Sequence, residues 1–324
     1  METRTVWFLK IINSQQVGIG ECAPLEGLSI DHLDQMDSKL TWVCQNIEMG
    51  LPALIDSTKD YPSIQMGLEM AFLSLNSPST FDLFPSEFLT NGASIRINGL
   101  IWMGKTSFMR QQIEEKLSQG FRCLKLKIGA IDWEEEFNLI KDLRKVYTSD
   151  QIELRVDANG AFQAHDVLHK LEQLSRLEIH SIEQPVSPLN QKLLEELCLV
   201  SPLPIALDES LIGLKSRTEK RNLLLSIRPK YIILKPSLLG GFTQSEEWIE
   251  IADELKIGYW ITSALESNLG LNAIAQWAFQ KRNPLAQGLG TGELFVNNLD
   301  SPLEVKEGNL IYNNTKHWNL NQIN

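Results

Sequence analysis

Hydrophobic and polar residues change their pattern about a third of the way along the chain. Ahead of that point, apolar runs at residues 5–12 and 17–21 predict the two strands of a hairpin. Apolar residues at helical spacing predict helices at residues 31–49 and 62–76. The N-terminal part, residues 1–93, is therefore expected to form an α+β domain.

Beyond residue 93, short apolar runs alternate with stretches of helical period in units of about 25 to 30 residues. The apolar runs end near Asn98, Lys127, Asp157, Glu183, Asp208, Lys235, Ser263 and Gly288. Helical periods lie between them, at residues 106–119, 133–147, 164–176, 189–199, 217–226, 243–256 and 268–281. Eight strands joined by seven helices predict a parallel α/β barrel over residues 94–289. A doubly wound open sheet is the alternative, which is disfavoured because no G-x-G-x-x-G follows the first strand.

The chain after residue 289 returns to a hairpin pattern. Apolar residues around 304–305 and 310–312 predict a further pair of strands. We expect this tail, residues 290–324, to pack back on the N-terminal domain.

Three of the predicted strands end in a carboxylate. Asp157, Glu183 and Asp208 are separated by 26 and 25 residues, about one strand–helix unit each. Strand ends meet at one rim of an α/β barrel, so the three side chains are expected to lie together. A divalent cation would relieve their repulsion, and oxygen ligands alone favour Mg²⁺, with Mn²⁺ as the next choice. Taken alone, Arg155 beside Asp157 indicates only a surface ion pair, but the repeat in consecutive units favours a metal site.

Lysines reach the same rim from other strands. Lys125 and Lys127 point to one side of the second strand, and Lys235 ends the sixth. Close ammonium groups lower one another's pKa, so we expect one lysine to act as a base near pH 7. A Schiff-base lysine is the alternative, but such an enzyme has no need of three carboxylates. A hard cation facing a lysine base suits removal of a proton α to a carboxylate, through an enediolate.

These residues resemble those of the enolase superfamily, from about residue 5 to residue 312. The K-x-K at 125–127, the three carboxylates and Lys235 are similar to its muconate-cycloisomerase-like subgroup. No histidine ends the seventh strand at 261–264, which disfavours the mandelate-racemase-like subgroup. The resemblance implies a (β/α)₇β modified TIM barrel with an α+β capping domain.

The same resemblance assigns roles to individual residues. It implies that Lys127 is the catalytic base and Lys235 the opposing catalytic lysine. The residues implied to hold Mg²⁺ are Asp157, Glu183 and Asp208. Those implied to support the ligands and the lysines from behind are Lys125, Asn159, Glu209 and Arg155.

Two later stretches are similar to the o-succinylbenzoate synthase branch of that subgroup. They read TSALESNLGL at 262–271 and QGLGTG at 287–292. The resemblance implies that the substrate is bound by Ser263, Glu266, Gly288 and Gly290. The implied substrate is a small anionic succinyl-hydroxycyclohexadiene carboxylate of menaquinone biosynthesis, which loses a proton and hydroxide from the same face. For the glycine-rich stretch a plain turn is an equal alternative.

Composition narrows the partners of the protein. The chain of 324 residues has a net charge of −11 without a basic stripe, so nucleic acid is not an expected partner. Its four cysteines are scattered without a C-x-x-C, so we expect neither a disulfide framework nor a cysteine metal site. The first residues lack the layout of a signal peptide, and no apolar run approaches a membrane span. We therefore expect a cytoplasmic protein with no membrane insertion, whose oligomeric state the sequence leaves open.

Rival functions use the same residues. In N-succinylamino acid racemisation or dipeptide epimerisation, the second lysine would return a proton on the opposite face. No acidic residue lies at 288–291 to bind the ammonium group of a dipeptide substrate, which disfavours dipeptide epimerisation. A catalytically silent barrel acting as a binding scaffold is the non-enzyme alternative. Relatives of the resembled family begin with a further strand and a mobile lid loop; these are expected to be missing here, which leaves residues 23–29 as the lid.

Overall fold

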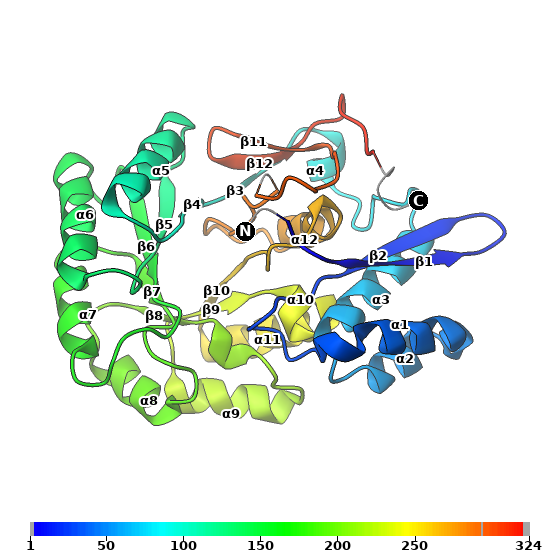
Figure 1. The fold of residues 1–324 in the computed structure, drawn as a ribbon, viewed down its shortest axis with the longest axis horizontal. Helices are drawn as coiled ribbons and strands as arrows, with labels where there is room; N and C mark the ends of the chain where they lie inside the picture. Colours follow the sequence, from blue (N-terminus) through cyan, green and yellow to red (C-terminus); the bar gives the residue numbers. More distant parts are fainter. Residues whose placement is uncertain (1–2, 293, 320–324) are drawn as a thin grey trace.

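Seven parallel strands form the central sheet of the computed structural model, which describes residues 3–292 and 294–319 (Figure 1). In sheet order the strands are β4 (Gly99–Ile101), β5 (Cys123–Lys127), β6 (Glu153–Asp157), β7 (Ser181–Glu183), β8 (Ile205–Leu207), β9 (Tyr231–Leu234) and β10 (Gly258–Ile261). Each strand pairs in parallel with the next strand along the chain. Consecutive parallel neighbours of this kind are typical of an α/β barrel.

Residues 287 and 288 close the sheet into a barrel. Gln287 bridges Ile97 beside β4, and Gly288 bridges Thr262 beside β10, both in parallel. The Asn98 N–H donates to the Gln287 carbonyl at 2.9 Å, and the Gly288 N–H donates to the Ile261 carbonyl at 2.8 Å. This two-residue segment therefore takes the place of the predicted eighth strand, and the (β/α)₇β barrel is confirmed.

Seven helices connect the strands, at α5 (Thr106–Ser118), α6 (Trp133–Val146), α7 (Val167–Ser175), α8 (Gln191–Val200), α9 (Arg217–Ile227), α11 (Gly241–Leu255) and α12 (Asn268–Gln280). Figure 1 shows α5 to α9 on the outer side of the strands. Side-chain caps start several of them: Asp132 accepts from the Glu134 N–H at 3.0 Å, and Ser216 forms a capping box with Glu219. The predicted helices are confirmed to within three residues at each end. The short α10 (Pro236–Leu239), directly after Lys235, was not predicted.

The N-terminal domain begins with the predicted hairpin. Strands β1 (Trp7–Ile12) and β2 (Val17–Cys22) pair in antiparallel fashion, and α3 (Pro62–Leu75) packs on them. The approach is close: a Cβ atom on Gly20 would lie 1.8 Å from the carbonyl oxygen of Gly67. Glycine at both positions therefore allows the helix backbone to lie directly against the strand.

The helix predicted over residues 31–49 is wrong as one continuous element. Only α1 (Met36–Gln45) is α-helical, with 3₁₀ turns at Leu33–Gln35 and Ile47–Met49, and α2 (Leu51–Ser57) follows. The Asn46 side-chain amide donates to the Trp42 carbonyl at 2.8 Å, which ends α1 locally. Upstream, Asp31 accepts from the backbone N–H and hydroxyl of Ser63, at 3.1 and 2.6 Å, in the first turn of α3.

Two buried glutamates of the N-terminal domain bind the starts of barrel helices. Glu21, at the end of β2, accepts from the Ser267 N–H at 2.7 Å and the Gly270 N–H at 2.8 Å, at the start of α12. Glu69, on α3, accepts from the N–H groups of Phe242 and Thr243, at the start of α11. Burial raises the pKa of both carboxyl groups. The domain is thus held against the barrel by carboxylates placed at the positive ends of helices.

The C-terminal hairpin joins the chain just ahead of the barrel. Strands β11 (Leu303–Lys306) and β12 (Asn309–Tyr312) pair with β3 (Ser94–Arg96), and α4 (Glu87–Thr90) packs on β12. Trp318 stacks on Phe81 at 4.5 Å between ring centroids. The predicted hairpin is confirmed; the domain limits at residues 93 and 290 stay predictions, and residues 320–324 of the predicted tail lie outside the described part.

One strand end was misplaced. The first barrel strand was expected to end near Asn98, but β4 begins at Gly99 and continues to Ile101. Asn98 lies inside the bridged region because its N–H binds Gln287, a contact between distant segments that a local pattern does not reveal.

No helix in the described part of the chain is long and apolar enough to cross a membrane. The four cysteines all lie in that part and are free thiols. The cytoplasmic location remains a prediction that rests on the sequence.

Candidate active site

Three carboxylates meet at the C-terminal ends of β6, β7 and β8. Asp157 is paired in register with Glu183, and Asp208 directly follows β8 on the next strand. Each residue offers an oxygen atom within 4.8 Å of the others, and all three are buried. Parallel strands bring their ends to the same rim, which is why a spacing of one strand–helix unit places these side chains together.

The three lysines of the rim pair with these carboxylates. The Lys125 ammonium donates to Glu183 and lies 2.9 Å from Asp157 Oδ2. Lys127 donates to the same Asp157 oxygen at 2.6 Å, and Lys235 donates to Asp208. The structure therefore brings together the six charged residues that the sequence singled out.

The charges in this cluster shift one another's protonation. Burial disfavours the ammonium form of Lys125, but Asp157, Glu183 and Asp208 outweigh it and hold the pKa of Lys125 well above its usual value. The pKa of Lys235 is raised by the same balance, with Asp208 as the strongest attraction. Lys125 does lower the pKa of Lys235, but the carboxylates outweigh it, so the expectation of a lowered pKa is wrong for these two lysines.

The carboxylates respond in opposite directions. Burial opposes ionisation of Asp157, yet the ammonium groups of Lys125, Lys127 and Lys235 hold its pKa far below the usual range. Burial is the main cause that raises the pKa of Glu183 to about 7. Attraction by Lys125 acts against this shift, and repulsion from Asp157 and Asp208 acts in the same direction as burial.

The donor set fits a hard divalent cation. Glu183 Oε1 is buried and has no hydrogen-bond partner among the described residues. A buried carboxylate oxygen without a partner is costly, and a cation would satisfy it. The ligands are oxygen atoms only, as Mg²⁺, Mn²⁺ and Ca²⁺ prefer.

A polar network behind the carboxylates fixes their positions. Asn159 donates its backbone N–H to Asp157 Oδ1 at 3.0 Å and its side-chain amide to Glu209 at 2.8 Å, while its own oxygen accepts from Lys127 at 2.8 Å. Asn159 has a φ of 42°, a conformation that asparagine tolerates well. The supporting positions expected for Asn159, Glu209 and Lys125 are thus all beside the cluster.

Gln184 belongs to this network and was missed. Its oxygen accepts from the Asp208 N–H and the Ser210 N–H, both at 3.2 Å, and its amide donates to the Val186 carbonyl at 3.0 Å. It thereby ties the end of β7 to the loop that carries Asp208. The signal was a buried amide directly after a strand-end carboxylate.

Arg155 lies apart from the other predicted residues. It is fully buried one layer below Asp157 in the barrel, where it donates to Glu153 at 2.7 Å and to the Ala286 carbonyl at 2.9 Å. Its guanidinium also stacks over Trp260 at 4.2 Å. Arg155 therefore fills the barrel interior and does not contact the three carboxylates.

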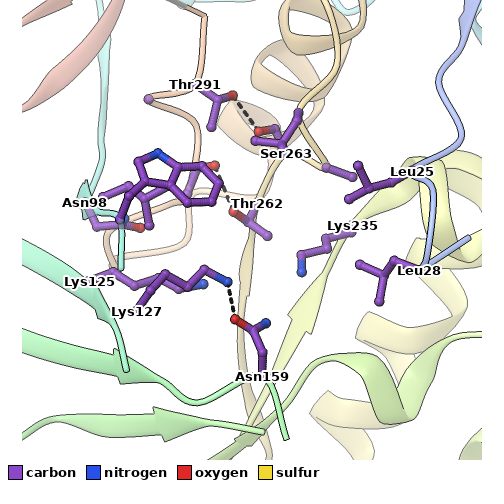
Figure 2. A pocket seen from close by; sticks show the side chains of 16 residues that line it. Leu25, Leu28, Asn98, Lys125, Lys127, Asn159, Lys235, Thr262, Ser263 and Thr291 are labelled. Carbon is purple, nitrogen blue, oxygen red and sulfur yellow. Dashed lines mark hydrogen bonds between the residues drawn. The ribbon is translucent and has the colours of Figure 1, made fainter. Parts of the chain in front are cut away.

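A cavity of about 230 Å³ opens above the lysines (Figure 2). Its wall includes Ser263, Gly288 and Gly290, three of the predicted substrate-binding residues. Figure 2 shows Lys127 and Lys235 reaching into it from opposite sides. Leu25 and Leu28, from the expected lid at residues 23–29, cover one edge.

Glu266 is not part of the cavity wall. It is buried behind the wall, where it accepts from the Ala264 N–H at 2.8 Å and from the Ser237 hydroxyl. Lining residues that were not named as substrate-binding from the sequence are Asn98, Leu100, Trp102, Thr262, Ala264, Leu265 and Thr291. The first three lie in or beside β4, the next three follow β10, and Thr291 follows the segment that closes the barrel.

The chain matches two family models. The model described as enolase C-terminal domain-like matches residues 108–315, and the model of the MenC N-terminal domain matches residues 1–75. These two matches cover most of the barrel and the first strands and helices of the N-terminal domain.

Two similar proteins and one more distant structure extend this comparison. An o-succinylbenzoate synthase of Desulfotalea psychrophila is 42% identical, over 95% of this chain and 92% of that protein. A crystal structure of MenC from Desulfotalea psychrophila has a TM-score of 0.86 at 41% identity, with 94% of each chain covered. The muconate lactonizing enzyme of Pseudomonas putida has a TM-score of 0.77 at 21% identity, over 95% of this chain and 89% of the other, which supports the fold alone.

The superfamily model covers well over half of the chain, and the most informative relative is aligned along nearly its whole length. The resemblance inferred from the K-x-K and the strand-end carboxylates is thereby confirmed. The chain belongs to the enolase superfamily and, within it, to the o-succinylbenzoate synthase family.

Proposed function

We propose that this protein catalyses the syn dehydration of 2-succinyl-6-hydroxy-2,4-cyclohexadiene-1-carboxylate to 2-succinylbenzoate, a step of menaquinone biosynthesis. The observation that carries the proposal is the 42% identity, over 95% of the chain, to an o-succinylbenzoate synthase. The cavity supports it, since ammonium groups face a space bordered by apolar side chains, as an anionic ring compound requires.

In this proposal Lys127 handles the proton. Its neutral amine removes the proton α to the ring carboxylate, and the resulting ammonium returns that proton to the leaving hydroxyl on the same face, so that water departs. Asn159 accepts a hydrogen bond from Lys127 at 2.8 Å and so aims the nitrogen into the cavity.

Lys235 faces Lys127 across the cavity and keeps its charge. Asp208 and Glu209 raise the pKa of its ammonium against the effect of burial, which suits a group that stays protonated. Placed over the ring, it would stabilise negative charge that develops there and contact the ring face as a cation.

Members of the superfamily use a divalent metal, and the buried group of Asp157, Glu183 and Asp208 could bind one. We propose Mg²⁺ as that ion. When bound, it would neutralise the negative charge that the substrate carboxylate gains as the α proton leaves. Lys125 and Gln184 would hold the ligand side chains in place from behind.

The central experiment combines dehydration kinetics with two alanine variants. Lys127→Ala and Lys235→Ala should each lower kcat by at least about 10³-fold while the far-ultraviolet circular dichroism stays that of the wild type. Glu134→Gln, an exposed change on α6, serves as a control for the expression and purification of a variant. Dehydration retained in either lysine variant would reject the assigned roles.

Metal dependence needs a separate measurement. Chelation should abolish formation of the aromatic product, and added Mg²⁺ should restore it. Full activity after thorough removal of divalent ions would contradict the metal proposal but not the assigned fold.

N-succinylamino acid racemisation is the second candidate, because Lys127 and Lys235 enter the cavity from opposite walls. Incubation of N-succinyl amino acids in D₂O distinguishes it, since racemisation exchanges the α proton without forming an aromatic product. An inactive protein that still binds 2-succinylbenzoate would favour the silent scaffold.

A further inference from the structure

One buried polar side chain of the cavity has no partner. Asn98 is 4% exposed and lines the cavity, yet its amide makes no hydrogen bond to another described residue, and its Oδ1 is buried. A buried amide without a partner costs about 1–3 kcal/mol. Such a group in a cavity wall points to a ligand that supplies the missing bond.

Most other polar side chains that line the cavity are already engaged. The Thr262 hydroxyl donates to the Gly288 carbonyl at 2.8 Å, and the hydroxyls of Ser263 and Thr291 bond to each other at 2.6 Å. Lys125, Lys127, Asn159 and Lys235 are held by the carboxylate cluster. Asn98 and the indole N–H of Trp102 remain uncommitted within the part of the chain that the structure describes, and of the two only Asn98 has a buried polar atom without a partner.

Strand register places Asn98 beside the segment that closes the barrel. One step beyond the Ile97–Gln287 bridge, Asn98 lies next to Gly288, which in turn bridges Thr262. Because Gly288 has no side chain, the Thr262 side chain occupies the place that a Cβ atom of residue 288 would take, and such a Cβ would lie 1.9 Å from Thr262 Oγ1.

Asn98 and Gly288 are on the far side of the barrel from the carboxylates. The sheet runs from β4 to β10 with β6, β7 and β8 in its middle, and residues 287–288 close it opposite them. A substrate whose ring carboxylate sits over Asp157, Glu183 and Asp208 therefore directs its remaining substituent toward Asn98 and Gly288. In the proposed reaction that substituent is the succinyl arm, which carries a ketone oxygen next to the ring and ends in a carboxylate.

We propose that Asn98 is a substrate-binding residue whose Nδ2 donates a hydrogen bond to an oxygen of the succinyl arm in the cavity. This inference rests on the proposed function, because it takes the arm from that substrate. A site that hydrogen-bonds a ligand group discriminates against ligands that lack it, so Asn98 selects for an oxygen-bearing arm.

The test pairs variants of Asn98 with altered ligands. Asn98→Ala removes the donor, and Asn98→Asp replaces it with a charged acceptor of the same size; Asn138→Asp makes the latter change on the exposed surface of α6. Dehydration kinetics give KM and kcat. Inhibition constants are measured for 2-succinylbenzoate, for benzoate, and for two analogues that lack either the ketone oxygen or the arm carboxylate.

Asn98→Ala should weaken the binding of 2-succinylbenzoate at least about tenfold, and Asn98→Asp should weaken it more. In the dehydration the effect should appear mainly in KM. The inhibition constant of benzoate should change less than about twofold. One of the two analogues should bind wild type and Asn98→Ala equally, which identifies the oxygen that Asn98 contacts. Asn138→Asp should match the wild type.

Three results would overturn the role of Asn98. They are unchanged constants in Asn98→Asp, equal weakening of benzoate and 2-succinylbenzoate, and unfolding of every Asn98 variant, which would make the residue structural. A wild-type protein that neither dehydrates the cyclohexadiene acid nor binds 2-succinylbenzoate would instead reject the proposed function itself.

Discussion

Gly288 is the glycine of the cavity wall at which an added methyl group should destabilise the protein most. The Cβ atom of an alanine there would lie 1.9 Å from Thr262 Oγ1 and 2.6 Å from Thr262 Cβ. Ordinary contacts between such atoms are about 3.5–4.0 Å, so Thr262 must move by about 1.5 Å. That movement breaks the hydrogen bond from the Thr262 hydroxyl to the Gly288 carbonyl, now 2.8 Å long.

The expected cost follows from these two effects. Overpacking of a tightly packed interior costs about 1–3 kcal/mol, and the lost hydrogen bond adds about 1 kcal/mol. For a chain of this size, Gly288→Ala should therefore lower Tm by about 4–8 °C. Because Thr262 and Gly288 both line the cavity, KM for the cyclohexadiene acid should rise as well.

A matched glycine and a double-mutant cycle make the reasoning testable. Gly290 lies in the same segment, but its nearest neighbour for a new Cβ is Ile97 Cδ1 at 3.3 Å, so Gly290→Ala should be far milder. Thr262→Ala removes the clashing oxygen, so the double variant Thr262→Ala, Gly288→Ala should lose at least about 1 kcal/mol less than the two single losses combined. Thermal unfolding and steady-state kinetics measure both. Additive losses within about 0.5 kcal/mol, or equal effects at Gly288 and Gly290, would refute the steric argument.

Three further substitutions probe buried carboxyl groups. Burial raises the pKa of Asp31 from 3.8 to about 6, so the folded state keeps a proton that the unfolded chain has lost, and wild-type stability falls as pH rises through that range. Asp31→Asn cannot titrate, so its stability relative to wild type should improve by up to about 3 kcal/mol between pH 4 and pH 7.5 in urea unfolding; parallel pH curves would contradict this. Glu21→Gln places an amide donor against the N–H groups that start α12 and should destabilise the protein by about 1–3 kcal/mol, with no comparable loss in the exposed Glu48→Gln. Glu136→Gln does the same to the backbone N–H groups of residues 129–131 and should also lower kcat, because that loop directly follows β5; unchanged kcat would separate the loop from catalysis.

The sequence predicted the residues whose positions depend on local pattern and on strand ends. Asp157, Glu183 and Lys127 each close a short apolar run, and the structure ends β6, β7 and β5 at these residues. Parallel pairing then brings these side chains together, since strands of one barrel expose their C-terminal ends on one rim. A one-dimensional spacing of strand–helix units was sufficient for this part of the site.

Residues placed by long-range contacts were not predictable in the same way. Asn98 marks a strand end in the sequence, but its backbone bond to Gln287 connects the two ends of the barrel. Glu266 was expected at the substrate, yet the Ala264 N–H and the Ser237 hydroxyl hold it behind the wall. For Asn98 the partner lies on the segment that closes the barrel, whereas for Glu266 one partner lies in its own loop and the other follows the neighbouring strand β9.

Charge was the property that the sequence predicted least well. Counting lysines suggested mutual lowering of their pKa, whereas distance decides the outcome: Lys125 lies 2.9 Å from one carboxylate and bonds to a second. Only the register of β5 with β6 brings Lys127 beside Asp157 and Lys125 beside Arg155, one layer lower. Protonation therefore depends on three-dimensional pairing that residue types alone do not specify.

The balance of charge in the cavity explains how a protein of net charge −11 can take an anion. Lys125, Lys127 and Lys235 offset the three carboxylates of the cluster, and burial together with Asp208 raises the pKa of the additional carboxyl, Glu209. With Lys127 neutral as the proposed base, a divalent ion among the carboxylates would leave this group with an excess of about one positive charge, which favours binding of an anionic substrate. The net negative charge of the protein does not prevent this binding, because the electrostatic field inside a narrow cavity is set by the groups that line it.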